Sequence, residues 1–250
     1  DLLRSHAVAA VSLTEVFRQA ERSAIIRNAH AVNSGRPPEL GSGQNDFFFL
    51  CRRAPDRLVQ TVVDLCRTRL PDNMGIPADQ IQVLSPTRKG VCGTVNLNRA
   101  LQAALNPPAA GKRQKLWGDM VFREGDRVMQ TRNNYDVVWE KADGTVGTGM
   151  FNGDVGRIVE IDQSGEWLAL DFDGRTAPYS TEMLSEIDLA YAQTVHKAQG
   201  SEYRCVVLAA MPSAPSLMVR GVLYTALTRA RELLVIVGDD AAVRSMAAND

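Results

Sequence analysis

The residues best suited to chemistry gather in residues 194–202, which read Thr-Val-His-Lys-Ala-Gln-Gly-Ser-Glu. Largely apolar runs, at residues 187–192 and 205–210, flank this segment, and we expect both to be strands. A short helix beginning at Thr194 would let the threonine hydroxyl and the free backbone N–H groups hold an anion. Gly200 would end that helix in a left-handed conformation. The alternative is a capped turn of helix that only joins two core strands.

A second segment, residues 224–231, reads Tyr-Thr-Ala-Leu-Thr-Arg-Ala-Arg and precedes an apolar run at residues 233–238. We expect a helix over residues 217–231, followed by a buried strand. Arg229 carries a planar, permanently charged guanidinium that suits phosphate oxygens. Its alternative role is a helix arginine paired with Glu232. The two segments together, in this order and with these flanking strands, resemble the last two motifs of superfamily 1 helicases. They are most similar to the RecD-like branch, the exodeoxyribonuclease V alpha-subunit family.

The composition is that of a globular protein with a substantial core. The chain has 250 residues, 45% hydrophobic and 23% charged, and a net charge of −1, so a DNA site would need a local basic groove. No apolar run approaches the roughly 20 residues of a membrane span. We expect a cytoplasmic protein with reduced thiols and no membrane partner. Because residue 1 is Asp rather than Met, we also expect the chain to be a fragment. The cysteines, none of which forms a Cys-x-x-Cys pair, are Cys51, Cys66, Cys92 and Cys205.

The first helix is expected to end near Val32 and to follow a strand at residues 6–13. Residues 13–30 resemble the motif that opens the second motor domain of RecD-like helicases. The resemblance implies that Arg18 reaches across an inter-domain cleft to the terminal phosphate of ATP. The alternative is a solvated arginine paired with Glu15 or Glu21.

A basic turn, Pro-Thr-Arg-Lys-Gly at residues 86–90, follows an expected strand at residues 81–85 and precedes an expected helix at residues 94–105. In parallel α/β sheets, ligands gather beyond the carboxyl ends of the strands. This placement suits contacts with a nucleic-acid backbone. The alternative is a basic turn that faces solvent. The residues in question are Thr87, Arg88 and Lys89.

Short strands and glycine turns replace helices beyond about residue 113, which indicates a small barrel. RecD-like helicases carry an inserted SH3-like barrel at this place, and the resemblance implies that it packs beside single-stranded DNA. Gln130, Asn133 and Asn134 are the polar contacts it suggests, and turn formation is the alternative role for the asparagines. Residues 135–149 depart from the shorter loop of the family.

The alternation of helices and apolar strands resumes after residue 185 and predicts an α/β fold of RecA-like type with a mostly parallel sheet. We therefore expect a discontinuous second motor domain at residues 1–112 and 183–250, with the barrel inserted at residues 113–182.

The resemblance also assigns roles to single residues. Arg229 matches the arginine finger, with Arg18 as its partner, and Glu202 matches the residue that binds the nucleotide ribose. Thr194, His196 and Gln199 match the group that couples the ATP cleft to DNA, and Lys197 would add positive charge there. The chain contains no Gly-x-x-x-x-Gly-Lys-Ser/Thr and no Asp-Glu after an apolar strand. We therefore expect ATP with Mg²⁺ to be bound mainly by an absent N-terminal motor domain, and assign no metal ligand here.

These inferences predict the C-terminal motor region of an ATP-dependent 5′–3′ DNA helicase of DNA repair and recombination, inactive in ATP hydrolysis on its own. Its partners would be single-stranded DNA, the N-terminal motor domain and other subunits of a recombination complex. The alternatives are a stand-alone module that binds single-stranded DNA or docks a partner, and the helicase half of a conjugative relaxase.

Overall fold

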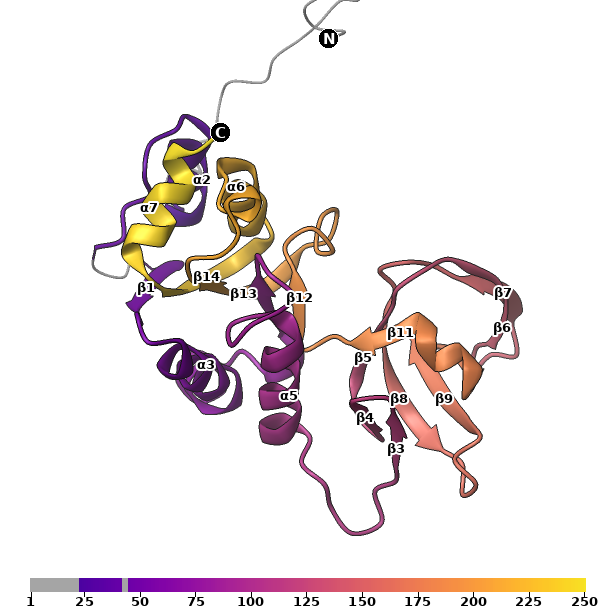
Figure 1. Ribbon diagram of the computed structural model, residues 1–250. Coiled ribbons are helices and arrows are strands. Elements are labelled where there is room, and N and C mark those ends of the chain that lie inside the picture. Colours follow the sequence, from indigo (N-terminus) through magenta and orange to yellow (C-terminus); the bar gives the residue numbers. More distant parts are fainter. Residues whose placement is uncertain (1–22, 42–44) are drawn as a thin grey trace, which may run out of the picture.

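Two sheets organise the computed structural model, which describes residues 23–41 and 45–250 (Figure 1). The first sheet has five strands, and every neighbouring pair in it is parallel. The structure thus has the α/β fold with a parallel sheet that the sequence predicts. The strands, in spatial order, are β1 (Phe47–Cys51), β14 (Ala230–Gly238), β13 (Tyr203–Ala210), β2 (Ile81–Ser85) and β12 (Ala192–Thr194).

Helices cover both faces of this parallel sheet (Figure 1). One face packs against α2 (Ala24–Asn33), α6 (Arg220–Leu227) and α7 (Asp240–Ala248). The other packs against α3 (Pro55–Asp64), α4 (Leu70–Met74) and α5 (Thr94–Leu105), and a π-helical turn at Leu65–Arg69 joins α3 to α4. Strand β13 is apolar almost throughout because its side chains enter the two cores alternately.

The second sheet is antiparallel and forms the SH3-like barrel, which lies beside the parallel sheet (Figure 1). Its core is apolar and aromatic, with Phe122, Phe172 and Tyr179 completely buried. A separate hairpin of β3 (Gln114–Trp117) and β4 (Met120–Arg123) precedes it. The strands of the antiparallel sheet, in spatial order, are β11 (Ile187–Leu189), β5 (Arg127–Gln130), β8 (Val155–Ile161), β9 (Trp167–Phe172), β10 (Arg175–Ser180), β6 (Asn134–Glu140) and β7 (Val146–Met150).

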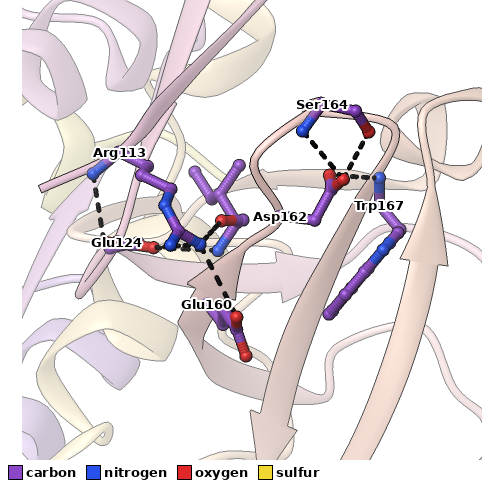
Figure 2. Close-up of polar contacts among 7 residues, drawn as sticks. Arg113, Glu124, Glu160, Asp162, Ser164 and Trp167 are labelled. Atoms are coloured by element: carbon purple, nitrogen blue, oxygen red, sulfur yellow. Dashed lines mark hydrogen bonds and ion pairs between the residues drawn. The ribbon is translucent and has the colours of Figure 1, made fainter.

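Carboxylates fix the β8–β9 end of the barrel (Figure 2). Asp162 accepts hydrogen bonds from the backbone N–H groups of Ser164 and Trp167, both at 3.0 Å, and from the Ser164 hydroxyl. The Ser164 hydroxyl is the main reason why the pKa of Asp162 is lowered. Glu124, just after β4, accepts from the backbone N–H groups of Arg113 and Ile161 at 3.0 Å each. The hairpin and strand β8 are thereby joined.

The single strand expected at residues 187–192 is in fact two strands that belong to different sheets. Strand β11 pairs antiparallel with β5, whereas β12 pairs parallel with β2. The buried side chain of Asn98 explains the break, because its amide donates to the carbonyl oxygens of Leu189 and Ala192 at 3.0 and 2.9 Å and accepts from the Ala192 N–H at 2.7 Å. Side-chain hydrogen bonds thus replace strand pairing at the crossing between the sheets.

Two expected helices also differ from the structure. Residues 195–200 form turns rather than a helix, although Gly200 is left-handed as predicted, with φ 88°. Burial of Val195 and Ala198 in the core draws this segment across the sheet face, from the end of β12 back to the start of β13. The helix expected at residues 217–231 ends at Leu227, which leaves Arg229 in the turn before β14. The strand expected at residues 6–13 lies outside the described residues.

The other helical boundaries agree with the sequence. The helix predicted at residues 94–105 is α5, and the helix expected to end near Val32 ends at Asn33. Within the described ranges, no helix combines the length and the apolar character needed to cross a membrane. All four cysteines are free thiols, and burial raises the pKa of Cys92 to about 11.

A buried carboxylate joins the barrel to the motor sheet. Asp126 is completely buried and receives a 2.7 Å hydrogen bond from the backbone N–H of Arg123. Three side chains also donate to it: Gln102 of α5 at 2.5 Å, Asn106 directly after α5 at 2.7 Å, and the Tyr191 hydroxyl at 2.9 Å. Burial raises the pKa of the Asp126 carboxyl, and these hydrogen bonds oppose that shift. The Asp126 cluster, as we call these residues, therefore fixes the barrel on α5 and on the strand crossing.

Candidate functional site

The carboxyl edge of the parallel sheet brings together two predicted groups of site residues. Strands β2 and β12 end side by side, with Thr194 opposite Ser85. The basic turn leaves β2 with Arg88 and Lys89 exposed, and the Thr87 hydroxyl donates to the Lys89 carbonyl oxygen at 3.2 Å. On the neighbouring strand, Thr194 caps the turn through a 3.3 Å bond from the Lys197 N–H to its hydroxyl oxygen. The side chains of His196, Lys197 and Gln199 are exposed just beyond it.

A pocket of about 400 Å³ lies between this edge and the barrel, and we name it the junction pocket. Its cations are Arg88 from the turn after β2, Lys197 from the turn after β12 and Arg132 from the loop after β5. Asp188 is its carboxylate and pairs with Arg88 at 3.2 Å. The remaining lining residues are Trp117, Met120, Thr131, Leu184, Ser185 and Ile187.

The cations of the junction pocket outnumber its carboxylate. Partial burial lowers the pKa of Lys197; the neighbouring Asp188 opposes the shift and Arg88 adds to it. The guanidinium of Arg132 donates to the Ser185 carbonyl oxygen at 3.2 Å, which leaves its charge available to an anion. Sequence reasoning missed Arg132, although it directly precedes the predicted Asn133 at the end of a strand.

The barrel residues predicted to contact DNA have structural partners. Gln130 is completely buried, and its amide accepts from the Tyr179 hydroxyl at 2.9 Å and donates to Glu186 at 3.1 Å. This geometry argues against a DNA contact by Gln130. Asn134 also donates to Glu186, at 2.9 Å, and Asn133 accepts from the Asn152 N–H at 2.9 Å. The alternative role of the asparagines, stabilising the loops, is therefore present in the structure, while Asn133 remains exposed.

The opposite, amino edge of the sheet carries Glu202 and Arg229. Tyr203 and Ala230 are paired at the starts of β13 and β14, which places the two predicted residues on adjacent chain segments. The guanidinium of Arg229 donates to the Ser201 carbonyl oxygen at 2.8 Å, to the Thr225 carbonyl oxygen at 3.2 Å and to the Thr228 hydroxyl at 3.2 Å.

Neutral oxygen atoms therefore position Arg229. The alternative pairing with Glu232 is not what the structure shows, because Glu232 binds Arg204 at 2.7 Å. Glu202 is exposed next to this arginine-bearing turn. The other predicted ATP ligand, Arg18, lies outside the described residues. Across residues 23–41 and 45–250, no three His, Cys, Asp or Glu side chains are grouped so that they could hold a metal ion.

Two regions of the chain match known helicase domains. Residues 97–172 match the ATP-dependent RecD-like DNA helicase SH3 domain, and residues 189–237 match the UvrD-like helicase C-terminal domain. The second match begins inside β11 and ends within β14, so it contains residues 194–202 and Arg229.

Curated relatives and solved structures agree with these matches. The ATP-dependent RecD2 DNA helicase of Deinococcus radiodurans is 34% identical over 247 residues, which are 99% of this chain and 31% of that protein. The RecBCD enzyme subunit RecD of Mycolicibacterium smegmatis is 29% identical over 168 residues, 67% of this chain and 26% of that protein. The chain thus spans less than a third of either relative.

The fold is shared with a Pif1 helicase from Bacteroides, solved in complex with ADP-AlF3 and ssDNA, at a TM-score of 0.53 and 17% identity. The match covers 94% of this chain and 53% of that one. The domain matches and the curated relatives point to the same group of proteins. The chain therefore belongs to the RecD-like superfamily 1 DNA helicases and corresponds to their C-terminal region.

Proposed function

We propose that this chain is the C-terminal motor region of an ATP-dependent 5′–3′ DNA helicase, and that it holds single-stranded DNA along the carboxyl edge of its parallel sheet. The junction pocket carries the proposal, because cations from the motor domain and from the barrel line one cavity at that edge. A polyanion that passes between two domains would be contacted by both. A RecD2 relative is named an ATP-dependent DNA helicase, which supports the same role here.

Within this interface, Arg88, Lys89, Arg132 and Lys197 would bind phosphates, which position the strand without reading its sequence. The polar side chains of Thr87, Thr194, His196 and Gln199, next to these cations, would contact phosphates or sugars. Asn133 and Asn134 would act at the barrel side, where Asn133 is exposed. The buried Gln130 would instead hold the barrel loops in place.

At the amino edge, Arg229 and Glu202 would serve ATP. The described partners of the Arg229 guanidinium are neutral oxygen atoms, so its charge is not compensated by a carboxylate. Phosphate oxygens can replace such partners. We propose Arg229 and Arg18 as the arginine fingers and Glu202 as the ribose ligand. ATP and Mg²⁺ would be held mainly by an N-terminal motor domain, so that this chain alone would not hydrolyse ATP.

The division into a motor domain, residues 1–112 and 183–250, and a barrel, residues 113–182, is also part of the proposal. One boundary of this division changes: because β11, residues 187–189, pairs with β5 of the barrel, we propose that the chain returns to the motor domain after Leu189 rather than at residue 183. A relative is a RecBCD enzyme subunit, so the intact protein could work with other subunits of a recombination complex.

Fluorescence anisotropy with a labelled oligothymidylate, titrated against salt, tests the DNA interface. The double variant Arg132→Glu, Lys197→Glu places carboxylates in the junction pocket and should weaken binding at least tenfold and reduce the salt dependence. Arg204→Ala is the matched control, because Arg204 pairs with Glu232 at the amino edge. Equal binding by the double variant and the control would overturn the proposal. Turnover of ATP by this chain alone would contradict its dependence on a second motor domain.

A further inference from the structure

Two aromatic rings are exposed at the open end of the β6–β7 hairpin of the barrel. Tyr135, at the start of β6, is 66% exposed, and Phe151, just after β7, is 42% exposed. Their ring centroids lie 5.7 Å apart, with an angle of 76° between the ring planes. This edge-to-face contact stabilises the pair while a large part of the ring surface faces solvent. Adjacent exposed aromatic side chains are a common mark of a binding site.

The surrounding loops hold this ring pair in place. Asn133 accepts from the Asn152 N–H at 2.9 Å and lies 3.4 Å from the Tyr135 hydroxyl, to which its amide donates. Asp154 accepts from the Phe151 N–H at 3.1 Å and pairs with Arg175 at 3.3 Å. The rings are therefore positioned before any ligand binds, which lowers the entropic cost of binding.

Gly149 makes room for the second ring. Its φ of 95° is a conformation that favours glycine, and a Cβ atom at this position would lie 3.1 Å from Cζ of Phe151. The ring thus covers a glycine backbone rather than being packed into the barrel core.

The loop that follows Phe151 is connected to the wall of the junction pocket. Backbone bonds join the loop after Phe151 to the end of β5, with Gly153 N–H donating to the Gln130 carbonyl oxygen at 2.9 Å and Gln130 N–H donating to the Asp154 carbonyl oxygen at 2.8 Å. The next residues, Thr131 and Arg132, line the pocket. The loop that carries Phe151 and the loop that carries Arg132 are therefore neighbours.

We propose that Tyr135 and Phe151 form a stacking platform for the bases of single-stranded nucleic acid whose phosphates lie in the junction pocket. The inference rests on the proposed function and adds a contact with bases to the contacts with phosphates. Every base has a π face, so stacking suits a motor that must bind any sequence. The cations nearby favour a nucleic acid over a neutral peptide as the occupant.

The test compares a normal oligothymidylate with an oligonucleotide of equal length that has abasic sites throughout, both titrated by anisotropy with the complete chain. The wild type should bind the base-bearing strand more tightly. Tyr135→Ala with Phe151→Ala should remove roughly tenfold of that binding and leave the affinity for the abasic strand and the salt slope unchanged. The aromatic exchange Tyr135→Phe with Phe151→Tyr should keep the preference.

Val138→Ala with Val146→Ala is the matched control, because both valines are exposed on strands β6 and β7 without being aromatic. A platform variant that still prefers the base-bearing strand as the wild type does would overturn the platform alone, and would leave the rings as a surface for protein docking. Failure of the wild type to bind either strand at low salt would overturn the DNA interface and the platform together.

Discussion

The two edges of the parallel sheet hold their cations in different ways. At the carboxyl edge, Arg88 and Lys197 are exposed and share one carboxylate, Asp188, in a pocket that the barrel completes. At the amino edge, Arg229 is partly buried, and its guanidinium donates to backbone and hydroxyl oxygens of three residues. The first arrangement suits a long polyanion bound by charge. The second suits one small ligand that needs an arginine in a fixed position and a second protein surface opposite it.

One continuous segment joins these edges. It begins at Thr194, crosses the sheet face with Val195 and Ala198 buried in the core, and ends at Ser201, whose carbonyl oxygen accepts from Arg229. If the Arg229 guanidinium turns toward a phosphate, its hydrogen bond to the Ser201 carbonyl oxygen breaks. That bond lies at one end of the segment, and the other end, at Thr194, lies beside the proposed DNA site. We expect nucleotide binding to alter the DNA interface through this segment.

The largest effect should come from Arg229→Ala in a longer protein that includes the N-terminal motor domain. ATP turnover should fall by about 10³-fold or more, which is the usual effect of losing an arginine finger, while DNA affinity stays nearly unchanged. Arg231→Ala is the matched control, because Arg231 lies two residues later, on β14, and is exposed. Similar ATPase rates for the two variants would remove the functional distinction between the edges.

The next effect concerns the attachment of the barrel to the part of the chain that forms the parallel sheet. Asp126→Ala leaves buried donors of Gln102, Asn106 and Tyr191 without their acceptor and should lower the free energy of unfolding by about 3–5 kcal/mol. Urea denaturation measures this loss. Asp119→Ala serves as the control, because Asp119 is exposed and its described contact is through the backbone carbonyl. A loss no larger than that of the control would mean that the Asp126 cluster does not hold the domains together.

A smaller effect is expected from Gly149→Ala at the ring pair. An alanine here would have to adopt a left-handed backbone, and its methyl group would press on the Phe151 ring. The variant should lose about 1 kcal/mol of the free energy of unfolding, and the ring should be displaced. Gly174→Ala separates the two causes, because Gly174 has φ 78° but no atom within 4 Å of its added Cβ. Both variants should be destabilised in thermal unfolding, and only Gly149→Ala should weaken binding to the base-bearing oligonucleotide.

The smallest effect is a pH dependence at Lys197. Desolvation by the surrounding pocket lowers the pKa of this ammonium group below its ordinary value of 10.5, so raising the pH should remove its charge earlier than that of a fully solvated lysine. DNA affinity should therefore fall as the pH rises through the lowered pKa, and Lys197→Arg should abolish this fall because arginine stays protonated. Identical alkaline titration curves for the wild type and Lys197→Arg would show that Lys197 does not bind the strand.

Short-range patterns predicted the fold class and most strands, because apolar runs and glycine turns are local signals. The break between β11 and β12 was not predictable in this way, since Asn98 causes it from a distant helix. The burial of Gln130 depends equally on Tyr179 and Glu186, which are remote in sequence. Family motifs singled out Thr194, Glu202 and Arg229 as candidate site residues, but not Arg132, which the tertiary structure brings into the junction pocket.

The insertion of the barrel has a consequence for the order of folding. Strands β2 and β12 are neighbours in the parallel sheet, yet residues 86–191 separate them, whereas three of the six strand pairings in the barrel join consecutive strands. Because local pairs close faster, we expect the barrel to fold first and to turn a long loop closure into a short one. Strand β14 comes last in the chain but lies between β1 and β13. During synthesis, the motor sheet therefore stays incomplete until residue 238 has emerged from the ribosome, when the barrel can already be folded.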